Sequence, residues 1–151
     1  MDQDPATAAK AIVDANPYMV LGTADEAGVP WVSPVYFTHV GYRDFLWVSK
    51  PGARHSQNIA VRPEVGIVVF DSSVPVGQGQ GVYLSAVAHQ LAGDDVGPGI
   101  AAFSERLLEH GEDAWTVDDV GASARHRLYR ATADAHFVLD DHDERIPFTL
   151  D

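Results

Sequence analysis

The chain has no cysteine, few cations and no long apolar run, and each absence removes a class of function. Without cysteine there is no disulfide framework, no thiolate metal site and no cysteine nucleophile. No apolar stretch approaches the ~20 residues that a bilayer-spanning helix needs. The opening residues also lack the basic segment and apolar run of a secretory signal. We therefore expect a cytoplasmic protein without a membrane partner.

Positive charge is scarce, with 10 Lys and Arg against 22 Asp and Glu and a net charge of −12. Binding to nucleic acid depends on neutralising many phosphates with Lys and Arg, so we expect no nucleic-acid partner. The length of 151 residues and the hydrophobic content of 46% fit a single globular domain with its own core.

The residue pattern predicts a mainly β domain with a few helices. Residues 1–16 form an N-terminal helix, 17–92 the barrel strands with a short inserted helix, 98–126 a helical segment and 127–140 the last strand. The expected strands are Tyr18–Ala24, Pro30–Thr38, Asp44–Ser49, Glu64–Asp71, Val82–Leu91 and Leu128–Leu139. Short connections between the first three favour antiparallel pairing. Six such strands favour a closed or nearly closed barrel, because closure removes exposed edges.

Four of the ten cations lie within one short segment of this acidic chain. They are Arg43, Lys50, Arg54 and Arg62, with Asp44 as the only acid among them. A short helix is expected from Ala53 to Val61, which places Arg54 and His55 in its first turn. Arginine donors beside the unpaired N–H groups of a helix start suit a small anion, above all phosphate. The alternative is a solvated helix face with scattered cations.

Three segments in this order resemble a known family. They are GVPWVSPVYF, FLWVSKPGARHSQNIAVRPEVGIVVFD and GQGVYLSAVAHQL, and together they resemble the flavin-binding split barrels of the pyridoxamine 5′-phosphate oxidase family. The resemblance covers residues 17–92 and, more loosely, 127–140. It implies a six-stranded antiparallel split β-barrel that forms a homodimer. It also implies FMN, or in some branches the deazaflavin coenzyme F-420, between the subunits, and oxidation or reduction of a small-molecule substrate.

The resemblance also implies a set of cofactor-binding residues, spread over two strands, the inserted helix and the start of the fifth strand. Carried over by position, they are Ser33, Pro34 and Val35 along the ring and ribityl chain, Trp47, Val48 and Ser49 at the end of the third strand, Lys50, Arg54 and His55 at the phosphate, Asn58 behind them, and Gln80 near the ring edge. No catalytic acid or base is identified. Pyridoxamine 5′-phosphate oxidase itself ends in a Trp and an Arg that this chain lacks, so another substrate is expected.

Other interpretations stay open beside the flavin enzyme. One is a non-catalytic flavin- or haem-binding module, for which His126 or His136 would be the axial ligand. The seven histidines show no close ligand pair, so we expect no metal site. A second cationic patch, formed by Arg125, His126, Arg127 and Arg130, either reaches the cofactor across the dimer, binds an acidic substrate or pairs with carboxylates at a subunit interface. Trp31 and Tyr36 line either the pocket or the dimer seam.

Overall fold

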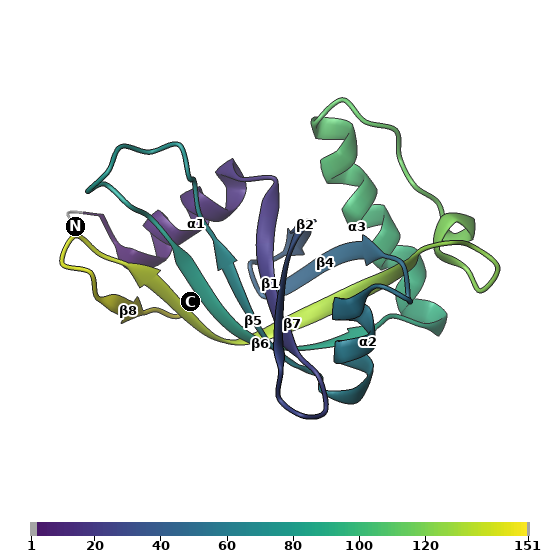
Figure 1. The fold of residues 1–151 in the computed structure, drawn as a ribbon. Helices are drawn as coiled ribbons and strands as arrows, with labels where there is room; N and C mark the ends of the chain where they lie inside the picture. Colours follow the sequence, from purple (N-terminus) through teal and green to yellow (C-terminus); the bar gives the residue numbers. More distant parts are fainter. Residues whose placement is uncertain (1–2, 151) are drawn as a thin grey trace.

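The computed structural model describes residues 3–150, which form three α-helices around one antiparallel sheet (Figure 1). The helices are α1 (Pro5–Ala15), α2 (Arg54–Val61) and α3 (Val96–Glu109), and 3₁₀ turns span Gly93–Asp95 and Val117–Val120. The strands are β1 (Tyr18–Ala24), β2 (Pro30–Tyr36), β3 (Thr38–Val40), β4 (Asp44–Ser49), β5 (Glu64–Val69), β6 (Val82–Gln90), β7 (Arg127–Leu139) and β8 (Arg145–Pro147).

The sheet curls upon itself because its two ends are joined along the chain. The strand order is β2-β1-β5-β6-β7-β4-β3, with β8 paired to β7 beside this path. Strands β2 and β3 lie at opposite ends of that order, yet Phe37 alone separates them in sequence. Figure 1 shows the resulting curved sheet, with α1 at one end and α3 at the other. The fold is therefore a mainly β, antiparallel half-barrel.

The count of six strands is not confirmed. The expected strand Pro30–Thr38 is divided at Phe37 into β2 and β3, because the chain there leaves one edge of the sheet for the other. Beyond the expected last strand, a turn with Asp143 at φ 61° returns the chain to pair with β7 as β8. All six expected strands are present, and these two changes raise the number to eight.

Alternation along the strands builds the core. In β1 the side chains of Met19, Leu21 and Thr23 are buried, while those between them point outward. Trp47, Phe37 and Phe45 are fully buried in the same cluster. Burying apolar surface contributes roughly 25 cal/mol per Å², so these large side chains dominate the stability of the half-barrel.

The helices cover the sheet with one face each. Asp4 caps α1 by accepting a hydrogen bond from the Thr7 N–H, with Pro5 as its first residue. Helix α3 buries Ile100 and Phe103 in a second cluster. It begins at Val96, two residues before the expected helical segment 98–126, and ends at Glu109, so the rest of that segment contains only the 3₁₀ turn. No helix within residues 3–150 is long and apolar enough to span a bilayer.

Candidate functional site

Helix α2 begins without a side-chain cap. The turn after β4 is closed by a 3.0 Å hydrogen bond from the Ala53 N–H to the Lys50 carbonyl, and Arg54 is the first helical residue. Ala53 occupies the cap position and its side chain has no hydrogen-bonding group, so none caps the helix. The first N–H groups of an α-helix have no partner within the helix and carry a partial positive charge. This helix start is therefore available to an anion.

Two cations beside that helix start are free of carboxylates. Lys50 and Arg54 are exposed, and no carboxylate of residues 3–150 forms an ion pair with either of them. The Arg54 guanidinium carbon lies 4.3 Å from the centroid of the Trp31 ring, which is 41% exposed. A cation over an aromatic face is held in position while its in-plane N–H groups stay available. In so acidic a chain, two unpaired cations at one helix start form a credible anion site.

His55 contributes hydrogen bonding rather than charge. Its Nε2 lies 2.8 Å from the Oγ of Ser49, a buried residue at the end of β4. Burial lowers the pKa of His55 below its ordinary value of 6.5. The imidazole is therefore neutral at pH 7, so the positive charge at this site comes from Lys50, Arg54 and the helix start.

Helix α2 is fixed to the β1–β2 hairpin along its length. The Asn58 side-chain amide donates to the Thr23 hydroxyl at 3.0 Å, and that hydroxyl donates to the Trp31 carbonyl at 3.3 Å. At the end of the helix, Arg62 donates to the carbonyl oxygens of Asp25 and Glu26 at 3.0 and 3.1 Å. Asn58 and Arg62 therefore position the helix and the hairpin.

The residues predicted on β2 and β4 differ in accessibility. Val35 is buried in the core, Ser33 is half-buried and Pro34 is exposed. Trp47 is fully buried and stacks on Tyr129, with ring centroids 5.8 Å apart. Its side chain is therefore part of the core, which leaves only the backbone of that position for a ligand. Val48 packs with the α3 cluster.

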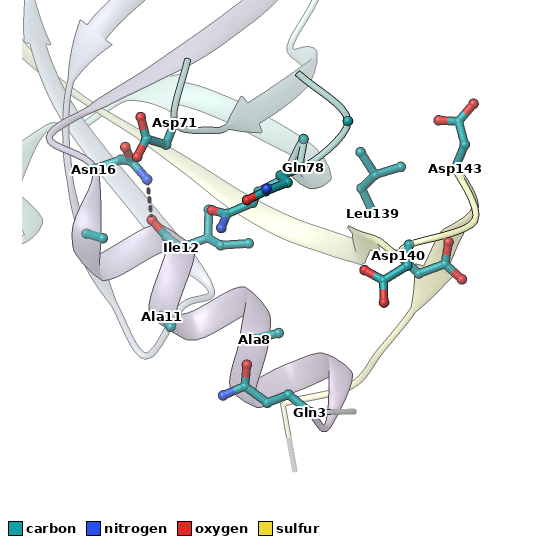
Figure 2. Close-up of a pocket in the computed structure, with 15 residues that line it drawn as sticks. Gln3, Ala8, Ala11, Ile12, Asn16, Asp71, Gln78, Leu139, Asp140 and Asp143 are labelled. Carbon is teal, nitrogen blue, oxygen red and sulfur yellow. Dashed lines mark hydrogen bonds between the residues drawn. The ribbon is translucent and has the colours of Figure 1, made fainter. Parts of the chain in front are cut away.

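Gln80 lies apart from the α2 set within one chain. It lines a cavity of about 930 Å³ between α1, the loop after β5 and the β7–β8 turn. Figure 2 shows Gln78 extending into this space, with Asp71 on one side, Asp140 and Asp143 on the other and α1 below. Neither α2 nor any Lys or Arg of the described residues lines it, so this cavity lacks the charge that a phosphate needs.

The histidines proposed as axial ligands are engaged in packing. His136 is buried, and its Nε2 lies 2.9 Å from the Tyr42 carbonyl oxygen. The His126 ring meets the Trp115 ring edge-on, with centroids 5.3 Å apart. Across residues 3–150 no three His, Cys, Asp or Glu side chains gather as metal ligands would.

Within one chain, the second cationic patch contacts backbone, while its contact with a cofactor, a substrate or a second subunit stays a prediction. Arg127 donates to the carbonyl oxygens of Ala122, Ala124 and His126 and so holds the loop before β7. The Nε of Arg130 is buried without a hydrogen-bond partner. Within the described residues no carboxylate forms an ion pair with this patch.

The structure brings together Trp31, Ser49, Lys50, Arg54, His55 and Asn58 around α2. Sequence reasoning left the role of Trp31 open and missed Thr23, which links Asn58 to the hairpin. The strand alternation is the one signal for Thr23, because it places this polar side chain on the buried face of β1. The arrangement can hold a phosphate-bearing ligand by charge and hydrogen bonds.

Comparison with solved structures places the fold among several kinds of protein. HutZ, the heme storage protein from Vibrio cholerae, is 24% identical, with 85% of this chain and 90% of that chain covered and a TM-score of 0.70. A heme-binding protein from Mycobacterium smegmatis is 16% identical with a TM-score of 0.75. The match covers 99% of this chain and 60% of that longer chain. An F420 reductase is 16% identical, with 84% of this chain and 94% of that chain covered and a TM-score of 0.61. At these identities the likeness concerns the fold.

The sequence itself decides the family. No curated protein matches the chain. The sequence model described as pyridoxamine 5′-phosphate oxidase, in contrast, matches residues 6–139. That range contains the whole of α2 and every strand of the half-barrel apart from β8. The chain therefore belongs to the pyridoxamine 5′-phosphate oxidase family.

Proposed function

We propose that this chain binds FMN by its phosphate at the N-terminus of α2 and acts as a small oxidoreductase. The observation that carries the proposal is the pair of unpaired cations, Lys50 and Arg54, beside an uncapped helix start. The phosphate of FMN is a compact anion, and the planar fork of an arginine can bind two of its oxygens at once. The donor set therefore fits the cofactor that the family membership suggests.

When bound, the flavin ring supplies the hydride or electron chemistry. The chain supplies position and charge. Arg54 and Lys50 balance the phosphate, and the Trp31 ring keeps the Arg54 side chain over one place. Ser49 and His55 hold each other in a fixed orientation beside the same helix start.

Strands β2 and β4 complete the proposed site. Ser33, Pro34 and Val35 on β2 would lie along the ring and the ribityl chain, and β4 would contribute the backbone of Trp47 and Val48. Gln80 would reach the ring edge only from a second subunit, since within one chain it lines the cavity beside α1. No acid or base at the site is assigned a catalytic role.

A homodimer is part of the proposal, and the outer face of the sheet supports it. Gly22 of β1 lies between Val32 of β2 and Gly66 of β5 in the strand register. Neither glycine carries a side chain, and Val32 is 61% exposed. The face continues to Val87 of β6, which pairs with Glu64 of β5 and is also exposed. Exposed valines beside two glycines leave part of this face apolar and without projecting side chains, which suits contact with a second copy of the same chain.

The decisive experiment compares three cofactors. The purified protein is incubated separately with FMN, coenzyme F-420 and hemin, and the absorbance of each gel-filtered sample is recorded. We expect a flavin spectrum from the FMN sample, bleached by NADH, NADPH or dithionite. A deazaflavin spectrum alone would replace FMN by coenzyme F-420. A Soret band alone would overturn the flavin proposal in favour of a haem protein.

The Arg54→Ala variant tests the phosphate grip. We expect FMN affinity to fall by at least ~1.5 kcal/mol, the low end for a hydrogen bond to a charged group. Arg43→Ala is the matched control, since Arg43 is an exposed cation of the same segment in the turn before β4. Equal affinity of both variants by fluorescence titration would remove Arg54 from the site.

A further inference from the structure

A second cavity lies on the other flank of α2. Arg54 and Asn58, four residues apart, share the stripe of the helix that faces the β1–β2 hairpin. Ser56 and Ala60, also four residues apart, lie about half a turn round the axis and line a cavity of about 430 Å³ between α2 and the ends of β6 and β7. That volume is within the range of ordinary small-molecule sites.

The lining of this cavity is uncharged. Ile59, Ala88 and Tyr129 form its buried part, and Pro51 and Pro63 lie at the two ends of α2. No Asp, Glu, Lys or Arg of the described residues lines it, and His89 is the one histidine in its lining. A charged ligand would lose its hydration here without gaining an ionic partner. The occupant suited to the cavity is therefore a neutral molecule with apolar surface.

Ser56, which lines the cavity, has a buried hydroxyl without a partner among residues 3–150. Ser56 is only 4% exposed, and its Oγ forms no hydrogen bond with any part of the chain that the structure describes. Burying an unpaired hydroxyl carries a free-energy penalty, so such groups are rare unless a water or a ligand satisfies them.

We propose that this cavity binds an uncharged aromatic molecule carrying an amide-type group, which pairs with the Ser56 hydroxyl. The hydroxyl both donates and accepts, and so does an amide. The side-chain amides of Gln57 and Gln90 lie at the exposed rim and offer the same dual bonding. Tyr129 adds an aromatic surface for a ring to pack against.

This site does not depend on the proposed flavin. It uses Ser56 and Ala60, whereas the phosphate grip uses Lys50 and Arg54, and the tests involve different variants. Failure of FMN binding would leave this cavity and its unpaired hydroxyl as they are. The second site would then serve a chain with another cofactor or none.

The experiment uses nicotinamide and benzamide as probes, because both are neutral rings with a carboxamide. Saturation-transfer NMR on the full chain measures binding at millimolar probe concentration. We expect both probes to bind. Ser56→Ala should weaken them about fivefold, the loss expected for one neutral hydrogen bond. Ala60→Phe should abolish binding by filling an exposed part of the cavity. Val61→Phe is the matched control, since Val61 is exposed on the same helix and lies outside the cavity.

Thermal unfolding of the unliganded variants separates ligand binding from a structural role. Ser56→Ala removes a hydroxyl that forms no bond, so its unfolding temperature should equal or exceed that of the wild type. A lower temperature would show that the hydroxyl serves the fold and would overturn the proposal. Equal binding to wild type, Ser56→Ala and Ala60→Phe would place the probes elsewhere, and absence of binding to the wild type would refute the ligand class.

Discussion

Arg106 of α3 donates a hydrogen bond of 2.6 Å to the carbonyl oxygen of Phe37, the single residue between β2 and β3. The same guanidinium donates to the carbonyl oxygens of Asn16 and Val13 at 2.9 and 3.5 Å, at the C-terminal end of α1. Its carbon also lies 4.5 Å from the centroid of the Phe37 ring. One buried cation thus joins α1, α3 and the point where the sheet changes edge.

Replacing Arg106 with Met should destabilise the fold by about 3 kcal/mol. The substitution keeps apolar volume but leaves three carbonyl oxygens near a helix end and a strand junction without their charged donor. Denaturant unfolding measures the change. Glu105→Gln, at the exposed preceding position of α3, is the control. A loss for Arg106→Met no larger than that of the control would show that backbone rearrangement or water replaces the guanidinium.

The stability of the unliganded protein should fall as the pH drops below about 6.5. Burial lowers the pKa of His55 in the folded state, while the unfolded chain keeps the ordinary value of 6.5. The unfolded state therefore binds the proton first. The contribution of neutral His55 is complete above 6.5 and is lost as the pH falls from there through the lowered pKa. Urea midpoints of wild type and His55→Gln across pH 5–8 should differ in slope below 6.5, and parallel curves would contradict this assignment.

Tyr42 should stabilise the fold in mildly alkaline solution. Burial, then the hydrogen bond to Asp14 and the charge of that carboxylate, raise the pKa of Tyr42 to about 12 from 10.0. The folded state therefore keeps this phenol protonated longer than the unfolded state does. Its contribution is complete below pH 10 and is lost as the pH rises from 10 to 12.

The matched pair for this prediction is Tyr42→Phe against wild type. Phe keeps the ring that stacks on His39 with centroids 4.1 Å apart, and it removes only the hydroxyl. The difference in unfolding free energy between the two proteins should shrink between pH 10 and 12. If that difference stays constant over the interval, the pKa of Tyr42 is not raised in the folded state.

A charge on the outer sheet face should separate the proposed dimer. Val32→Glu places a carboxylate opposite Gly22, which in turn pairs with Gly66. Neither of these paired positions offers a cation to the new carboxylate. Burying an unpaired carboxylate costs several kcal/mol, so the dimer should dissociate at least tenfold more readily. Light scattering after size exclusion gives the mass. Val117→Glu, an exposed valine in the second 3₁₀ turn, is the control. If the wild type is monomeric at high concentration, the homodimer proposal is wrong.

Local pattern explains most of what was predictable in the fold. The six expected strands and the N-terminal helix are present because strand-forming runs and the Asp4-Pro5 helix start act within a few residues. The division at Phe37 and the addition of β8 depend on where distant strands lie. Helix α3 begins two residues before the expected 98, and its first turn holds Gly97 and Pro98, which discourage a helix interior but are tolerated there.

The site divides in the same way. The cluster of Lys50, Arg54 and His55 at a helix start was predictable because it is local in sequence. The contact between Arg54 and Trp31, and the one from Arg62 to the β1–β2 turn, cross more than 20 residues and follow from the folded topology. Gln80 was placed by resemblance alone, and its role remains a prediction.

Helix α2 is fastened to the same hairpin at both ends, by Arg54 on Trp31 and by Arg62 on the Asp25 carbonyl. Because the helix is held at both ends, it cannot rotate relative to the hairpin, and the two should move as one rigid body. A ligand bound on either side of α2 should therefore restrict the hairpin as well. Amide hydrogen exchange in the hairpin should slow when either the flavin or the aromatic amide is bound.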